Sequence, residues 1–248
     1  MATLSPTLTV KEPRPRHGGG GDVPRFPRGG GDGRGDDGSP DYSERLRRYR
    51  LGLAVGIAPI VMLFVSFTSA YIVRQGLGSW DNRLNAYAND WLPVNIPTLL
   101  LLINTIILIV SSVTMELARR QAAQEVILAP VATIPGVSAG NERPFPWLGL
   151  TVVLGLAFLV GQYLAWRALA ARGFFVATSP SSSFVYLLTG MHALHLAGGV
   201  LALLYALATS LLRKPVEVRR IVVDVTAWYW HFMALLWIYI FALLQFAR

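Results

Sequence analysis

The stretch that decides the fold is SPSSSFVYLLTGMHALHLAGGVLALLYALATSLL, residues 179–212. It contains no Asp, Glu, Lys or Arg, and it is longer than the roughly 20 apolar residues that a helix needs to cross a bilayer. The serines around Pro180 are typical of a helix start, because Ser caps the first amides and Pro lacks one. The stretch therefore predicts a transmembrane helix that carries two histidines, His192 and His195.

Four further apolar segments surround this one in the chain. The five predicted spans cover about residues 51–73, 91–115, 145–169, 184–212 and 221–246. Backbone groups in lipid must be satisfied internally, so we expect helices, and the alternating pattern of a membrane barrel is missing. The sequence predicts an all-α integral membrane protein with five transmembrane helices in a bundle. The start of residues 116–144 is expected to continue the second helix beyond the bilayer.

The composition excludes several classes of protein. Of 248 residues, 53% are hydrophobic and 15% are charged, and the mean hydropathy is +0.46. Soluble domains carry about 25% charged residues, so a soluble single-domain enzyme is excluded. The chain has no cysteine, which excludes a disulfide scaffold, thiolate metal sites and cysteine nucleophiles. The net charge of +8 does not indicate nucleic-acid binding here, because the basic residues mostly flank the spans.

The basic residues also predict the topology. Residues 1–44, rich in Gly, Pro, Arg and Asp, are expected to form a disordered cytoplasmic tail, and residues 45–248 the membrane domain. If the N-terminus is inside, 17 Lys and Arg residues lie on the inner side and 5 on the outer. We therefore predict a cytoplasmic N-terminus and a periplasmic C-terminus. A basic group precedes the first span; we interpret it as a topology signal, with recognition of anionic lipid as the alternative. Its members are Arg45, Arg47, Arg48 and Arg50.

Three histidines lie inside predicted spans, at roughly 13 to 18 Å from one membrane surface. They are His192, His195 and His231. If the last two helices are neighbours, the three side chains meet near mid-depth. One interpretation is a haem or metal site. We favour the other, interhelical hydrogen bonds that lock two helices together, because no carboxylate accompanies the imidazoles. Glu116 and Asp224 lie near the ends of spans and do not resemble the middle of a proton path.

Several of these segments resemble one family, subunit III of the haem–copper cytochrome c oxidases. SPSSSFVYLLTGMHALHLAGG and YWHFMALLWIYIF, at residues 179–199 and 229–241, are similar to that family's last two helices. FVSFTSAYIVR, INTIILIVSSVTMELA and LGLAFLVGQYLAWR are similar to the three preceding ones. The resemblance covers about residues 45–247 in order. It implies the five-helix short form of a family whose longer members have seven helices.

The resemblance also implies function. It implies an accessory subunit without catalytic residues, metal or redox cofactor of its own, with haem and copper in partner subunits. The partners would be catalytic subunit I and subunit II, with cytochrome c reaching the complex through other subunits, and no nucleic acid. The subunit would bind phospholipid and support assembly and proton uptake during aerobic respiration in the bacterial inner (plasma) membrane. Five residues match the family and are candidates for interhelical or lipid contacts: His192, His195, Trp230, His231 and Trp237.

The chain departs from the family pattern at three carboxylates. Ile60, Ala165 and Ala234 stand where the family commonly has Glu, Glu and Asp. A carboxylate-linked proton role inside this chain is therefore not expected. The homologous subunit of a quinol oxidase or of a nitric oxide reductase stays open as an alternative. A stand-alone membrane haem protein or a transporter is a further alternative, although the chain has no internal repeat of the kind that transporters show.

Overall fold

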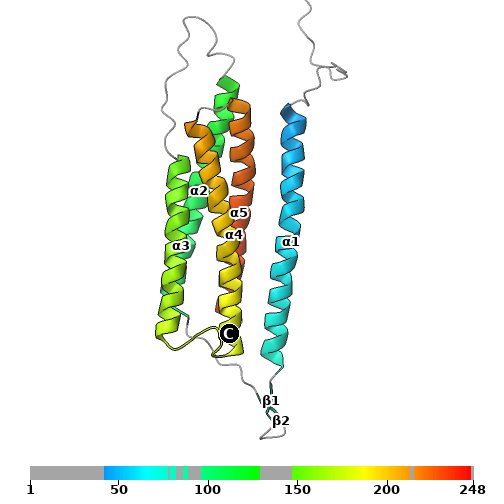
Figure 1. Cartoon of the computed structure of the whole chain (residues 1–248), viewed down its shortest axis with the longest axis vertical. Helices are drawn as coiled ribbons and strands as arrows, with labels where there is room; N and C mark the ends of the chain where they lie inside the picture. The colour runs from blue at the N-terminus through cyan, green and yellow to red at the C-terminus, as the bar shows by residue number, and fades with distance from the viewer. Residues whose placement is uncertain are drawn as a thin grey trace, which may run out of the picture. The chain divides into compact units, whose positions relative to one another are not determined.

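The computed structural model describes residues 42–77, 79–81, 86–88, 96–128, 147–212 and 215–246. Five long helices account for most of them (Figure 1). They are α1 (Tyr42–Gly76), α2 (Thr98–Leu128), α3 (Trp147–Ala171), α4 (Pro180–Leu211) and α5 (Val216–Phe246). Each is long and apolar enough to cross a membrane, which confirms the five predicted spans. Residues 42–44 of the predicted tail begin α1, and residues 1–41 lie outside the described residues.

The second helix differs from its prediction at the start. The hydropathy pattern placed this start near Trp91, but residues 96 and 97 are not helical and α2 begins at Thr98. Pro97 explains the boundary, because proline has no N–H to donate and disfavours a helical residue before it. At the other end α2 continues past Met115 to Leu128, which confirms the expected continuation of this helix.

Local sequence fixes the turn from α3 to α4. Gly173 follows α3 with φ +82°, and its amide and that of Phe174 donate to the carbonyls of Ala170 and Leu169. This is a Schellman motif, in which glycine tolerates the left-handed conformation. Ser179 then caps α4 through a capping box with Ser182, and Pro180 occupies the first turn, as the sequence predicts.

Four of the helices pack closely around one core. α2 packs against α3 and α5, and α4 packs against α3 and α5 (Figure 1). The largest fully buried side chains include Trp230, Trp237 and Phe158, which come from α5 and α3. α1 lies beside α4 and α5 and contacts both. Only 11% of its membrane-crossing window is buried in the chain, against 33–39% for the other four helices.

A short ribbon interrupts the helical chain between α1 and α2. Strands β1 (Ser79–Asp81) and β2 (Ala86–Ala88) pair antiparallel, with Trp80 opposite Tyr87. The sequence analysis predicts no strand here, because three-residue strands are too short to show alternation.

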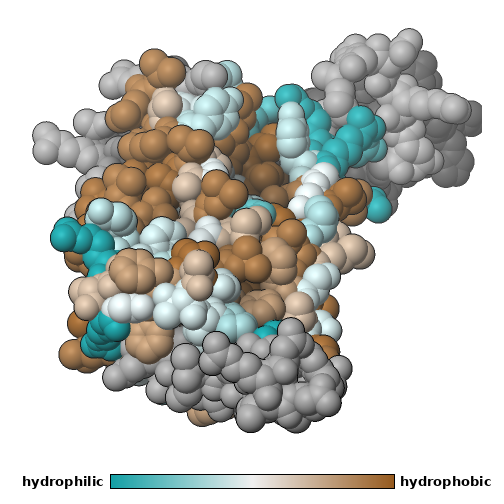
Figure 2. All heavy atoms as spheres, turned by 60° about the horizontal axis from the view of Figure 1, so that its bottom comes forward, coloured by the Kyte–Doolittle hydropathy of each residue, from teal (hydrophilic) through white to brown (hydrophobic). Residues whose placement is uncertain are grey.

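The helices expose large apolar side chains outward. Val55, Leu99 and Leu201 are 67–73% exposed, and Figure 2 shows apolar residues over much of the face it presents. A soluble protein rarely carries apolar surface on this scale. The arrangement is that of helices whose outer faces meet lipid or other membrane-spanning chains.

Candidate functional site

Two hydrogen bonds between buried side chains join α5 to α2. Trp230 Nε1 donates to Ser111 Oγ at 3.1 Å, and Trp237 Nε1 donates to Thr105 Oγ1 at 3.0 Å. Both indoles are buried, at 0% and 1% exposure. The two tryptophans are seven residues apart and so share a helix face. Trp230 and Trp237 are candidates from the sequence, whereas their hydroxyl partners are not; the only sign of these partners is that Ser and Thr residues occur within an apolar span.

Two glycines make room for Trp230 between α3 and α4. A Cβ built at Gly155 of α3 would lie 2.8 Å from Trp230 Cη2, and one at Gly199 of α4 would lie 3.2 Å from Trp230 Cζ3. The first distance would force the packing to shift, and the second would require the indole to move by a few tenths of an ångström. The indole therefore fills a slot to which Gly155 gives the room that a larger residue would take, and at which Gly199 fits tightly.

His231 lies against α2. Its Nδ1 shares a hydrogen bond with Ser112 Oγ at 2.6 Å, and its Nε2 is 3.5 Å from Glu116 Oε2. The expectation that His231 meets His192 and His195 was wrong. Helices α4 and α5 do pack against each other, as expected. The rotation of α5 about its axis, however, turns His231 toward α2 and not toward the histidines of α4.

The other two histidines occupy different surroundings. The ring of His192 is fully buried, and its centroid lies 5.0 Å from that of Trp237 and 5.9 Å from that of Phe158. His195 Nδ1 and the carbonyl oxygen of Met191 form a hydrogen bond of 2.7 Å. The imidazole nitrogen is the donor, since a carbonyl oxygen can only accept. Among the described residues, no group of three or more His, Asp or Glu side chains is arranged to hold a metal ion.

A network of charges ties α1, α2 and α5 together. Asp224 of α5 accepts from Arg50 Nε and Nη2 at 2.8 and 2.9 Å and from Arg119 Nη1 at 3.3 Å. Arg119 in turn donates to Glu116 at 2.7 and 2.9 Å, and Arg120 donates to Glu116 at 2.9 Å. The Asp224 side chain is only 9% exposed. Buried charges persist in proteins when they are paired and hydrogen-bonded in this way.

This network is not predictable from the sequence alone, which shows only that Glu116 and Asp224 lie near the ends of spans and that Arg50 belongs to the basic group before the first span. The structure shows Arg50 in an ion pair with Asp224. The sequence does place opposite charges of three helices at a similar predicted depth in the membrane. Because an unpaired charge at that depth is costly, ion pairs between these helices could have been expected.

The remaining three arginines of the basic group differ from one another. Arg48 pairs with Glu44 on the exposed surface, at 3.4 Å, and Arg47 is exposed. Arg45 and Tyr49 line a pocket of about 340 Å³ between α1, α4 and α5. Its other lining residues are Tyr205, Val218, Ile221, Val222, Val225 and Thr226. The wall of this pocket is mainly apolar, and Arg45 is the charged residue among those that line it.

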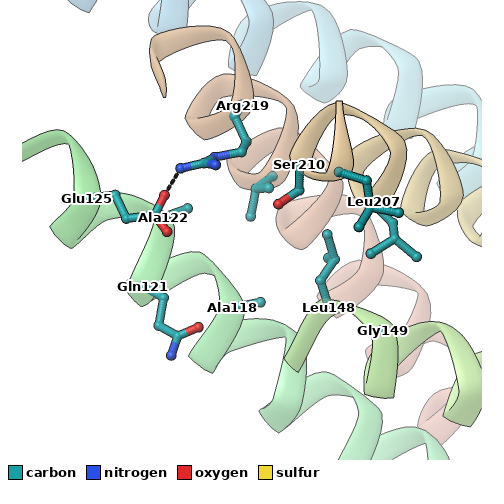
Figure 3. A pocket seen from close by; sticks show the side chains of 11 residues that line it. Ala118, Gln121, Ala122, Glu125, Leu148, Gly149, Leu207, Ser210 and Arg219 are labelled. Atoms are coloured by element: carbon teal, nitrogen blue, oxygen red, sulfur yellow. Dashed lines mark ion pairs between the residues drawn. The ribbon is translucent and has the colours of Figure 1, made fainter. Parts of the chain in front are cut away.

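A second, smaller pocket lies between α2, α3, α4 and α5 (Figure 3). Arg219 of α5 points toward Glu125 of α2 and forms an ion pair with it. Gln121 and Ser210 are the other polar side chains at its wall. The pair again joins α2 to α5.

The three positions that lack the family's carboxylates are filled by apolar side chains. Ala165 and Ala234 are 1% and 5% exposed, and Ile60 packs against the core. The carboxylates common in the family are therefore replaced by apolar side chains on α1, α3 and α5.

Comparison with known proteins is consistent across the chain. The model of the family "Cytochrome c oxidase subunit III" matches residues 45–247. A probable cytochrome c oxidase subunit 3 of Mycobacterium leprae is 28% identical over 202 residues, which cover 80% of this chain and 87% of that protein. Cytochrome c oxidase subunit 3 of Synechocystis is 30% identical over 86% of this chain and 79% of its own length. Cytochrome bo(3) ubiquinol oxidase subunit 3 of Pseudomonas aeruginosa is 30% identical over 56% of this chain and 60% of its own.

The family match spans all five helices, and two relatives named for the same subunit cover four fifths or more of the chain. The resemblance seen in the sequence is thereby confirmed. The chain belongs to the cytochrome c oxidase subunit III family and is an accessory subunit of a haem–copper oxidase, an oxidoreductase complex of the respiratory membrane.

Proposed function

We propose that the chain is the non-redox subunit III of a bacterial, proton-pumping oxidase that takes electrons from cytochrome c. The observation that carries this proposal is the family match over residues 45–247, together with subunit 3 relatives of cytochrome c oxidases over 80–86% of the chain. In this function the chain packs against catalytic subunit I, with subunit II completing the complex. Haem and copper belong to those partners, and this chain supplies assembly and the stability of proton uptake.

The proposed location is the inner (plasma) membrane, with the N-terminus in the cytoplasm and the C-terminus in the periplasm. The excess of Lys and Arg on one side of the spans supports this topology, 17 against 5. The network of Arg50, Arg119, Glu116 and Asp224 then lies toward the cytoplasmic side.

Purification of the complex through a tag on this chain tests the proposal. We expect co-purifying large subunits identified by mass spectrometry, haem bands from those subunits, and oxygen consumption driven by reduced cytochrome c. The chain expressed alone should show no haem absorption. Recovery of the chain without a haem–copper partner would contradict the proposal.

A second candidate is the equivalent subunit of a quinol oxidase. The ubiquinol oxidase relative favours it, although the match covers only 56% of this chain. The same preparation separates the two, because the quinol enzyme would consume oxygen with a reduced quinol and not with cytochrome c. A nitric oxide reductase would instead reduce nitric oxide in the same assay.

We further propose that the pocket at Arg45 binds a phospholipid of the surrounding membrane. Its apolar walls on α4 and α5 suit an acyl chain, and the Arg45 guanidinium suits a phosphate group. Arg47, two positions away and exposed, lies outside the pocket and offers a matched control. Native mass spectrometry of the complex should show one phospholipid fewer with Arg45→Gln and an unchanged lipid count with Arg47→Gln. An unchanged count in both variants would reject this site.

A further inference from the structure

Four buried polar atoms inside the group of helices α2 to α5 have no hydrogen-bond partner among the described residues. They are Asn104 Nδ2, Gln162 Oε1, and both His192 ring nitrogens, Nδ1 and Nε2. The three side chains are 1%, 2% and 0% exposed. Buried polar groups in native proteins are almost always hydrogen-bonded, to protein or to ordered water. Several unpaired atoms in one region therefore require an explanation.

Contacts between α3 and α4 place Gln162 about one helical turn from the residue of α3 that contacts His192. The ring of His192 packs against Phe158, and Gln162 follows Phe158 by one helical turn. One turn further along α3, Trp166 Nε1 donates to Thr189 Oγ1 at 3.0 Å. Thr189 precedes His192 by three residues on the same face of α4. On α3, Gln162 thus lies between two residues, Phe158 and Trp166, that contact α4 directly, and one of these contacts is with the buried imidazole.

Asn104 reaches the same level from α2. A Cβ built at Gly161 of α3 would overlap the Asn104 amide, so the two helices are in contact there. The next residue, Thr105, accepts the indole N–H of Trp237, whose ring packs on His192. Polar atoms from three neighbouring helices therefore gather within one layer of the core.

We propose that Asn104, Gln162 and His192 form a site for ordered internal water. The amide nitrogen of Asn104 donates, the amide oxygen of Gln162 accepts, and a neutral imidazole does one of each. Water both donates and accepts, and buried waters commonly make about three such hydrogen bonds. The site does not suit a cation, since the described residues contain no cluster of three or more His, Asp or Glu side chains for one.

This water site holds for either electron donor, because it depends only on residues of this chain. More than one water molecule is needed to give every unpaired atom a partner, because the two ring nitrogens of His192 point in different directions. The site also accounts for a buried glutamine in α3 and a buried asparagine in α2, each of which has an amide atom without a partner among the described residues. The water would connect α2, α3 and α4 through hydrogen bonds, in addition to the direct packing of α3 against α2 and α4.

The test is a map of the complete detergent-solubilised complex by electron cryomicroscopy, at a resolution that shows ordered water. We expect density within hydrogen-bond distance of Gln162 and of a His192 ring nitrogen. A direct hydrogen bond between these two side chains with no density between them, or a layer without any density, would overturn the proposal.

Two variants provide an independent measurement. Gln162→Leu removes the acceptor at similar volume, and Gln121→Leu makes the same change on α2 at the wall of the smaller pocket. Infrared difference spectra in H₂¹⁸O should show an isotope-sensitive O–H band that is lost in Gln162→Leu and kept in Gln121→Leu. A band unchanged in Gln162→Leu would overturn the site. If Gln162→Leu does not assemble, the map of the unmodified complex decides the matter.

Discussion

Asp224 of α5 accepts two hydrogen bonds from Arg50 of α1, 174 positions earlier in the chain, at 2.8 and 2.9 Å. This bidentate pair is significant because α1 buries little of its surface against the rest of the chain. The remaining contacts of α1 follow one stripe, which includes Phe64, Thr68 and Tyr71. The pair therefore fixes one end of a helix that is otherwise held weakly.

Asp224→Asn is expected to loosen α1 and to lower the temperature at which the subunit leaves the complex. Removing one partner of a fully buried pair costs about 3–5 kcal/mol. The Arg50 side chain is 45% exposed, so we expect roughly 1–3 kcal/mol here. Heating the purified complex and measuring retained subunit gives the result. Glu44→Gln, which breaks the exposed pair with Arg48, is the control and should have little effect. Equal effects of the two variants would contradict the role of Asp224.

Trp237→Phe is expected to destabilise the helix group by about 1–2 kcal/mol, since it removes the hydrogen bond to Thr105 and part of a buried ring. Trp228→Phe makes the same change at a side chain that is 54% exposed, and it should stay within about 0.5 kcal/mol. Thermal unfolding in a fixed detergent compares the two. A larger loss at Trp228 would show that the interior contact contributes little.

His231→Leu is expected to weaken retention of the subunit and to leave the haem spectrum of the complex unchanged. The variant leaves Ser112 without its 2.6 Å partner and removes the imidazole beside Glu116. His231→Gln keeps a polar group that can bond to the serine, so it should restore much of the retention. Quantifying the subunit by gel or mass spectrometry after purification checks this. Full retention of His231→Leu would be evidence against the contact.

A fusion of alkaline phosphatase to the C-terminus is expected to be active, and the same fusion at the N-terminus inactive. The enzyme folds only outside the cytoplasm, and the basic residues predict that the C-terminus lies there. A fluorescent protein fused at each end supplies the opposite readout. Activity at the N-terminus would reverse the proposed topology.

The helices and some of their ends were predictable because their causes are local. An apolar run of sufficient length forces a helix in lipid, and the Ser179–Pro180 start of α4 is encoded within four residues. The partners of His231 and Asp224 were not predictable in this way. They depend on how each helix rotates about its own axis, which is set by packing against neighbours far away in sequence. The sequence therefore indicated that these polar side chains need partners, but not which residues supply them.

The slot around Trp230 places a constraint on how this protein can vary. The indole and the two glycines, Gly155 and Gly199, together fill a volume shared by three helices. A larger residue at Gly155 is expected to need a smaller one at position 230, and one at Gly199 to need at least a small shift of the indole, because a packed interior tolerates changes best when its total volume is kept. Homologous chains should therefore change these three positions in concert, and a single replacement at one of them should be rarer than a compensated pair.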